Sequence, residues 1–168
     1  MGKEKVRHYA FKTDYKYVVP SIVTPINVRP AGITQDVESK FNKVIALWDT
    51  GATMSVISPE LANKLNLIPV GKKTVTGVNS KEIVDTYLID IGLPNRMLLS
   101  GVEVAESAFV GGDILIGMNI IQMGDFAIAN AKGKTRFSFC IPPHDNPICL
   151  FEKTQKVDKN FTSQPAFT

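Results

Sequence analysis

Short apolar runs of strand length, rather than long helical repeats, dominate the hydrophobic pattern of this chain. The segments 15–28, 72–93 and 125–139 are rich in β-branched and aromatic residues and contain turn-forming Gly, Pro, Asn and Ser, which is typical of strands joined by turns. Pro20 and Pro25 restrict the first segment to a sheet edge or a bend, because proline cannot donate a ladder hydrogen bond. The pattern predicts a mainly β fold.

Glycine-containing turns divide these segments further. Residues 76–80, with the sequence TGVNS, predict a hairpin with a polar tip, and 132–134 predict a second hairpin turn. The segment 95–107 predicts another pair of strands, broken at Ser100 and Gly101. The result is a fold built from many short strands.

Two mainly apolar runs predict buried strands, and a residue with a distinctive chemical or conformational property follows each of them. Residues 41–48 end on the carboxylate of Asp49. The run 114–116 continues into Gly117 and then into a helical turn that ends at Gly124. The ends of both strands are therefore candidate parts of a functional site.

One helix start is well marked. Ser58 is an N-cap residue and Pro59 fits the first helical position, while Leu61 and Leu65 share one face. A short helix is predicted within 58–67, so the chain has one or two short helices beside its strands.

Length and composition are those of one globular domain with polar ends. The chain has 168 residues, of which 44% are hydrophobic and 21% charged, enough for a sizeable core. We expect a loosely held basic arm at 1–16, a folded domain at 17–141 and a polar tail at 142–168. There is no internal repeat.

The net charge of +3 and the pI near 8.8 are mildly basic. Because five of the basic residues crowd the arm, we interpret the excess as a solvated segment and expect no nucleic-acid partner. A basic nucleic-acid-associated β-protein remains an alternative, which salt-dependent binding to random DNA would reveal. Asp85 and Asp90, beside the apolar residues 87–89, are predicted to be solvated acids at strand edges.

The sequence predicts a cytoplasmic protein without a membrane partner. The start MGKEKVRHYA has no apolar signal region, and no run approaches the roughly 20 apolar residues of a membrane span. Cys140 and Cys149 are too few for a disulfide framework, although one bridge between them stays open. No Cys/His group has zinc-site spacing, so no metal or cofactor is expected, and His8 and His144, outside the apolar segments, are not expected to be catalytic.

Asp49 raises the central question of the sequence. A buried carboxylate is costly unless it is paired, hydrogen-bonded or neutralised. Asp-Thr-Gly alone is a weak signal, because Asp and Gly are common in turns and Asp49 could simply cap one. Its context is more specific: an apolar strand precedes it, and a second apolar strand ending at Gly follows some sixty residues later, with a Gly-tipped hairpin between them.

This order of motifs resembles the retropepsin-type aspartic proteases over about residues 20 to 140. The motifs that carry the resemblance are LWDTGATMSVIS, TVTGVNSKEI and ILIGMNII. The resemblance implies a closed, barrel-like acid-protease half-domain that forms a C2 homodimer. It assigns catalysis to Asp49, support of the catalytic loop to Thr50, Gly51 and Ala52, a substrate-covering flap to Thr76, Gly77, Val78 and Asn79, and the second apolar-Gly motif to Ile116 and Gly117.

The chemistry implied is peptide hydrolysis by water that two carboxylates activate. Two close carboxylates share one proton, so that one acts as base and the other as acid. The chain has a single Asp-Thr-Gly, so the second Asp49 would come from a second copy of the chain. The expected partners are the chain itself and an extended peptide or protein substrate, and Thr50 would bond across the two-fold axis.

The sequence also departs from the family. Thr53 and Met118 stand where many retroviral members have an acid and an arginine that pair, and Trp48 is bulkier than the usual aliphatic residue. The hairpin 125–139 is longer than the usual single C-terminal strand, and we expect it to contribute to the dimer sheet. A catalytically silent, dimeric peptide- or protein-binding module with the same fold is therefore the alternative to an aspartic endopeptidase.

Overall fold

The computed structural model describes residues 6–32, 41–76, 81–94, 96–146 and 148–157. In chain order its elements are β1 (Tyr9–Asp14), β2 (Ile22–Pro30), β3 (Asn42–Trp48), β4 (Val56–Ile57), α1 (Pro59–Lys64), β5 (Gly71–Thr76), β6 (Lys81–Gly92), β7 (Leu98–Glu106), β8 (Ile114–Ile116), α2 (Met118–Ile121), β9 (Asp125–Ala131), β10 (Lys134–Ile141) and α3 (Leu150–Val157). None of the described helices is long and apolar enough to cross a membrane.

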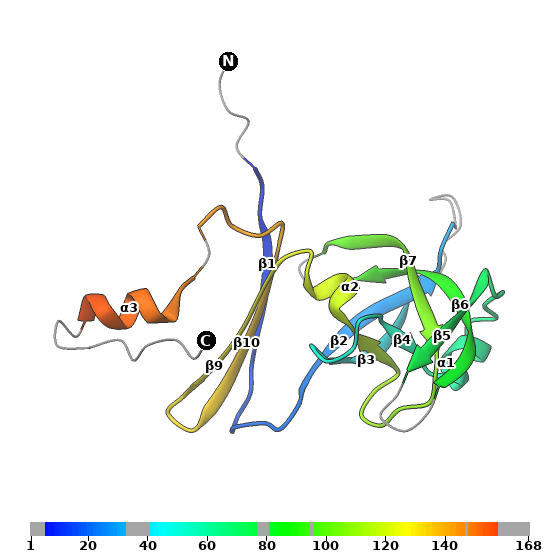
Figure 1. The fold of residues 1–168 in the computed structure, drawn as a ribbon, viewed down its shortest axis with the longest axis horizontal. Helices are drawn as coiled ribbons and strands as arrows, with labels where there is room; N and C mark the ends of the chain where they lie inside the picture. Colours follow the sequence, from blue (N-terminus) through cyan, green and yellow to red (C-terminus); the bar gives the residue numbers. More distant parts are fainter. Residues whose placement is uncertain (1–5, 33–40, 77–80, 95, 147, 158–168) are drawn as a thin grey trace, which may run out of the picture.

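Within the described residues, six strands close into a mixed barrel, on the right of Figure 1. Their hydrogen-bonded order is β2-β3-β8-β4-β7-β6, and β6 pairs back onto β2 through Asn27–Pro30. The pairs β3–β8 and β4–β7 are parallel, and the other pairs are antiparallel. The strand β5 extends the sheet beyond β6. The predicted closed, mainly β barrel is thus confirmed for a single chain.

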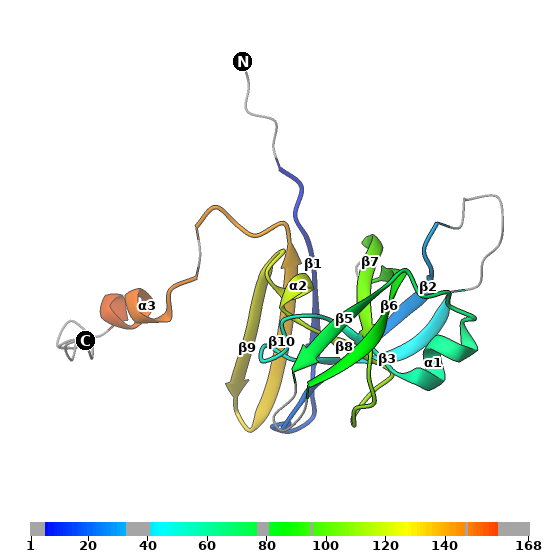
Figure 2. The same cartoon turned by 45° about the vertical axis from the view of Figure 1, so that its right-hand side comes forward.

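A second sheet stands beside the barrel, as the two views in Figures 1 and 2 show. It has the order β1-β10-β9, with both pairs antiparallel. The predicted turn at 132–134 joins β9 to β10, and β1 pairs along its own full length with residues 136–141 of β10. The first and last strands of the described chain therefore meet in one sheet.

Trp48 fastens this sheet to the barrel. Its ring is buried and packs at centroid distances of 4.9 Å from Phe137 and 5.0 Å from Phe139, both on β10. Its indole Nε1 donates to Thr24 Oγ1 on β2 at 2.9 Å, so the polar end of the ring is satisfied. The large side chain of Trp48 thus packs between the barrel and the second sheet, whose buried residues form one hydrophobic core.

Several local predictions are confirmed. Ser58 caps α1, accepting a hydrogen bond from Leu61 N at 3.2 Å, and both Leu61 and Leu65 are buried. Pro25 lies in β2 opposite Ile45 and before β6 begins to pair, where β2 has a neighbour on one side only.

Other expectations are corrected. The segment 95–107 supplies one strand, β7, because Gly101 adopts a positive φ of 65° that absorbs a register shift against β6. Asp90 is not solvated: it is buried, pairs with Arg29 at 3.0 Å and accepts from Gly101 N at 3.0 Å. Asp85 is partly exposed and pairs with Lys72.

The ends of the chain also differ from expectation. The basic segment expected to be loose contains β1, whose Phe11 packs against the core. The expected tail contains α3. Cys140 and Cys149 are both free, so no bridge joins them. The division of the chain at residues 17 and 141 stays a prediction.

Candidate active site

Asp49 lies directly beyond the end of a parallel strand pair in the barrel. Trp48 of β3 is paired with Ile116 of β8, and the next backbone amide, that of Asp49, donates to Ile116 O at 2.9 Å. All of β8 is buried, and so are Val44, Ala46 and Trp48 on one face of β3, whereas Ile45 is exposed, so the expected buried strand buries one face only. The buried face of β3 and the whole of β8 fix the position of Asp49 at the edge of the barrel core. The side chain itself is half-buried.

The loop after β3 turns its own amide toward the carboxylate. Gly51 N donates to Asp49 Oδ1 at 2.8 Å, and Ala52 N donates to Asp49 O at 3.4 Å. A Cβ at Gly51 would lie 3.1 Å from that same carboxylate oxygen, which explains a small residue there. Thr50 is exposed, as are Gly51 and Thr53 of the same loop. The arrangement holds the carboxylate in one orientation at the protein surface.

The second apolar-Gly motif, Ile116 and Gly117, leads into residues that are hydrogen-bonded to this loop, and we call this contact between the two segments the crossing. Met118 N donates to Ala52 O at 2.8 Å, and Asn119 N donates to Thr53 O at 3.1 Å. A Cβ at Gly117 would come within 2.6 Å of the Met54 carbonyl carbon and oxygen, so only glycine fits the crossing. The residues that follow Ile116 and Gly117 are thus hydrogen-bonded to the loop that carries Asp49.

Two polar side chains that sequence reasoning missed, the buried Ser55 and the half-buried Asn119, hold the two motifs together. Ser55 Oγ accepts from Gly117 N at 3.0 Å and donates to Asn119 Oδ1 at 2.8 Å, while Ser55 N donates to the same oxygen at 2.9 Å. Ser55 is fully buried. A signal was present, because Ser55 directly precedes the apolar pair Val56-Ile57 and Asn119 interrupts the apolar residues 118–121.

A hollow of about 450 Å³ adjoins the loop. Its lining comes from two places, the loop that follows Asp49 and the strand β5: Gly51, Ala52, Thr53, Met54, Val56, Lys73, Thr74 and Val75. The predicted flap continues from β5, where Thr76 pairs with Lys81 of β6. Gly77, Val78 and Asn79 lie outside the described residues.

An ion pair and a hydrogen bond connect the lining of this hollow to the crossing. Lys73 pairs with Glu103 of β7 at 2.5 Å, and this ammonium group lowers the pKa of the Glu103 carboxyl. The backbone carbonyl of Glu103 accepts from Asn119 Nδ2 at 3.4 Å. These contacts therefore link β5, through Glu103 of β7 and Asn119, to the loop of Asp49.

Asp49 has no acidic neighbour bonded to it within the described part of this chain. Asp113, at the other end of β8, accepts from Ile45 N at 2.9 Å and so serves the start of the strand pair. Asp125 is bonded to His144. Among the described residues, Asp49 is therefore the one carboxylate that a single chain supplies at this loop.

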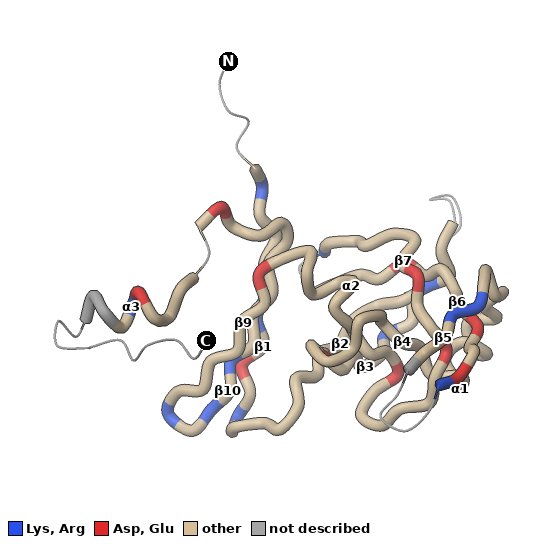
Figure 3. The backbone as a smooth tube through the Cα atoms, in the orientation of Figure 1, with Lys and Arg blue, Asp and Glu red and all other residues tan. Residues whose placement is uncertain are grey.

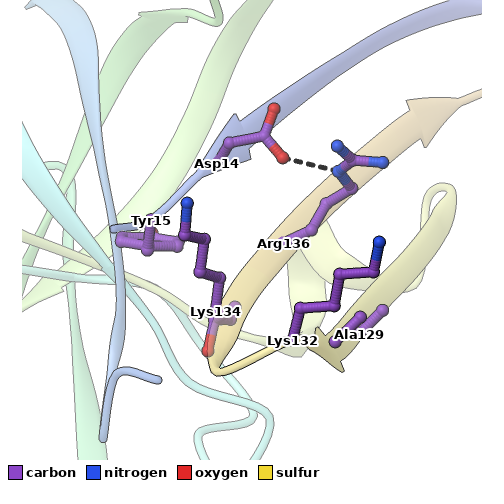
Figure 4. Close-up of a pocket in the computed structure, with 8 residues that line it drawn as sticks. Asp14, Tyr15, Ala129, Lys132, Lys134 and Arg136 are labelled. Atoms are coloured by element: carbon purple, nitrogen blue, oxygen red, sulfur yellow. Dashed lines mark hydrogen bonds and ion pairs between the residues drawn. The ribbon is translucent and has the colours of Figure 1, made fainter. Parts of the chain in front are cut away.

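A larger hollow, of about 530 Å³, lies on the second sheet and contains no residue of the Asp49 loop. Figure 4 shows Lys132, Lys134 and Arg136 around it, with Asp14 paired to Arg136 at 2.5 Å. Hydrogen bonds from Lys12 and Arg136 lower the pKa of Asp14. Basic residues gather at this hairpin turn in Figure 3, so this hollow is a solvated cationic surface separate from the candidate site.

Residues 36–123, more than half of the chain, match the model of the family described as "gag-polyprotein putative aspartyl protease". The chain belongs to this retropepsin-like aspartyl protease family. The matched region contains Asp49 and Gly117 together with the whole crossing between them. No curated protein matches the sequence.

One solved structure supports the fold, and two others are similar to a lesser degree. A retropepsin-like aspartic protease from Rickettsia conorii is 14% identical, with a TM-score of 0.50, and the match covers 82% of this chain and 98% of that one. The EIAV protease in an inhibitor complex is 16% identical with a TM-score of 0.46, covering 61% and 86%. The retroviral protease-like domain of Ddi1 from Leishmania major is 13% identical with a TM-score of 0.38, covering 67% and 91%.

Proposed function

We propose that this protein is an aspartic endopeptidase whose active site consists of two Asp49 carboxylates, one from each chain of a homodimer. The observation that carries the proposal is the loop of Asp49, in which Gly51 orients the carboxylate and Gly117 crosses behind it. This loop belongs to a family of aspartyl proteases. The proposed location is cytoplasmic.

The chemistry needs two carboxylates with different protonation. In the proposed mechanism, an ionised Asp49 takes a proton from water while the water oxygen attacks the peptide carbonyl carbon. The protonated Asp49 of the other chain donates to the carbonyl oxygen, and proton transfer to the amide nitrogen then releases the amine. Because the two carboxylates share one proton, neither copy holds a fixed role.

Two features support association of two chains. Thr50 is exposed beside Asp49, where its hydroxyl can bond to a partner loop. Within the described chain β9 pairs on one side only, with β10, and its side chains from Ala127 to Ala131 are exposed. An open strand edge of this kind can pair with another chain. We therefore propose that the dimer sheet forms at β9, because Thr53 and Met118 cannot form the acid–arginine ion pair that many retroviral members have at these positions.

The proposed substrate is an extended peptide. The strand β5 is at the end of its sheet and lines the hollow next to Ala52, so a peptide can add as a further strand between hairpin and loop. The flap residues Thr76, Gly77, Val78 and Asn79 would then cover it. The proposed reaction uses no cofactor.

A diverse peptide library, with and without a statine peptide as a transition-state mimic, tests this function. We expect cleavage at internal peptide bonds that the statine peptide inhibits, because it resembles the tetrahedral intermediate. Peptides that bind at the Asp49 loop and are never cleaved would support the alternative, a silent binding module. Absence of both binding and cleavage would contradict both functions.

A further inference from the structure

We propose that His8, Cys140 and His144 form a binding site for a divalent transition-metal ion of the zinc type, at one end of the second sheet. One ring nitrogen of each histidine and the Cys140 sulfur all lie within 4.8 Å of one another. They include both histidines of the chain, which are 136 positions apart in sequence. Imidazole nitrogen and thiolate sulfur are the ligands that zinc prefers.

The register of the sheet brings these groups together. Tyr9 of β1 is opposite Ile141 of β10, which places the preceding His8 beside the end of β10. Cys140 is opposite Asp125, the first residue of β9. All three strands thus contribute to one edge, where the N-terminal segment enters the sheet and the chain leaves β10 toward α3 in Figure 1.

Each histidine is already oriented by a second partner. His8 Nδ1 lies 3.0 Å from Pro142 O, an acceptor, so this nitrogen carries the proton. His144 Nδ1 lies 2.5 Å from Asp125 Oδ2, which also accepts from His144 N at 2.9 Å. With both Nδ1 atoms donating, Nε2 of each ring has the free lone pair. A carboxylate or carbonyl behind a metal-binding histidine is the usual second partner in zinc sites.

The two histidine side chains must move for a metal ion to bind, and their exposure allows this movement. Around tetrahedral zinc, donor atoms lie about 3.4–3.6 Å apart, given Zn–N and Zn–S bonds of about 2.0–2.1 and 2.3 Å. The rings of His8 and His144 are stacked at 4.4 Å and 6°. Parallel rings cannot both aim at one ion, so binding must tilt them apart. Both side chains are exposed and can turn, while buried Cys140 stays fixed.

Three protein ligands leave a fourth position for water or another donor. A bound metal ion would connect His8, which precedes β1, to His144, which follows β10, and would thereby stabilise the pairing of β1 with its sheet. Cys140 would bind as thiolate and release its proton to solvent. This site is independent of Asp49, so the proposal stands or falls separately from the protease function.

Titration of the full-length, metal-free protein with Zn²⁺ against a chromophoric chelator tests the site. We expect one ion per chain, and weakening of more than about 100-fold in His8→Gln and in His144→Gln, because each loses a ligand. Asp125→Asn should weaken binding about 10–100-fold, since it removes only the second partner of His144. Zn²⁺ should raise the melting temperature of the natural chain and leave that of His8→Gln unchanged.

Co²⁺ substitution identifies the sulfur. The Co²⁺ form should show a thiolate-to-metal charge-transfer band that Cys140→Ser removes and the matched control Cys149→Ser keeps. Because His8 and His144 are exposed, their variants remain informative if Cys140→Ser fails to fold. Equal Zn²⁺ affinity of the natural chain and both histidine variants, or a band that depends on Cys149, would overturn the site.

Discussion

Asp49→Asn is expected to abolish peptide hydrolysis while the protein keeps its fold and its ability to pair. Asparagine has nearly the same shape and retains an Oδ1 that can accept from Gly51 N, now 2.8 Å from the carboxylate. What it loses is the capacity to take up and deliver a proton. Loss of a general acid–base group costs about 10²–10⁴-fold in rate, and here both members of the dyad are lost together.

The measurement is kcat/KM on a peptide from the library, with circular dichroism and sedimentation of the same samples. Asp113→Asn is the matched control, because Asp113 is at the other end of β8 and bonds only the start of the strand pair. It should keep its activity per folded molecule. Undiminished cleavage by Asp49→Asn would contradict the aspartic mechanism.

Gly117→Ala is expected to damage both stability and activity. The added methyl would lie 2.6 Å from the Met54 carbonyl carbon and oxygen and 2.9 Å from Ala52 O, all backbone atoms. Hydrogen bonds tie this backbone to the crossing, since Ala52 O accepts from Met118 N. Overpacking of this kind costs about 1–3 kcal/mol, and rigid neighbours place Gly117→Ala at the upper end. Displacement of the loop by about 1 Å can lower kcat about 10²-fold.

Gly92→Ala is the control for this prediction. Gly92 lies in β6, and its added methyl would meet Asn27 Cβ at 3.4 Å, an ordinary contact. Its unfolding free energy, measured by urea denaturation, should change by less than about 1 kcal/mol. Equal stability and equal kcat for Gly117→Ala and Gly92→Ala would show that the crossing does not position Asp49.

Features encoded in short stretches could be predicted from the sequence. The capped helix at Ser58, the turn at 132–134 and the two apolar strands ending at Asp49 and Gly117 depend on neighbours within a few residues, so local patterns revealed them. The order of these motifs then indicated the family, which the match over 36–123 confirms.

Pairings between distant residues could not be predicted in this way. The basic residues around β1 hid its strand character, because the partner β10 begins more than a hundred residues later. Asp90 looked solvated because Arg29, its partner, belongs to a different strand of the closing barrel. The proximity of His8, Cys140 and His144 was also not visible in the sequence, because it depends on the register of the second sheet. The environment of each of these residues depends on a contact between strands that are distant in sequence, so local sequence patterns could not predict it.

The dependence of activity on protein concentration tests the central claim, a catalytic site shared by two chains. One Asp49 cannot be base and acid in the same step, so a monomer should be inert and active sites should appear only as chains associate. Initial rates should be measured over a wide dilution series, with sedimentation of the same samples. The account predicts that activity per chain falls as the sedimenting species changes from dimer to monomer, and that it varies little with salt, because the proposed contacts are strand pairing and apolar burial. Constant activity per chain in samples that sediment as monomers would contradict it.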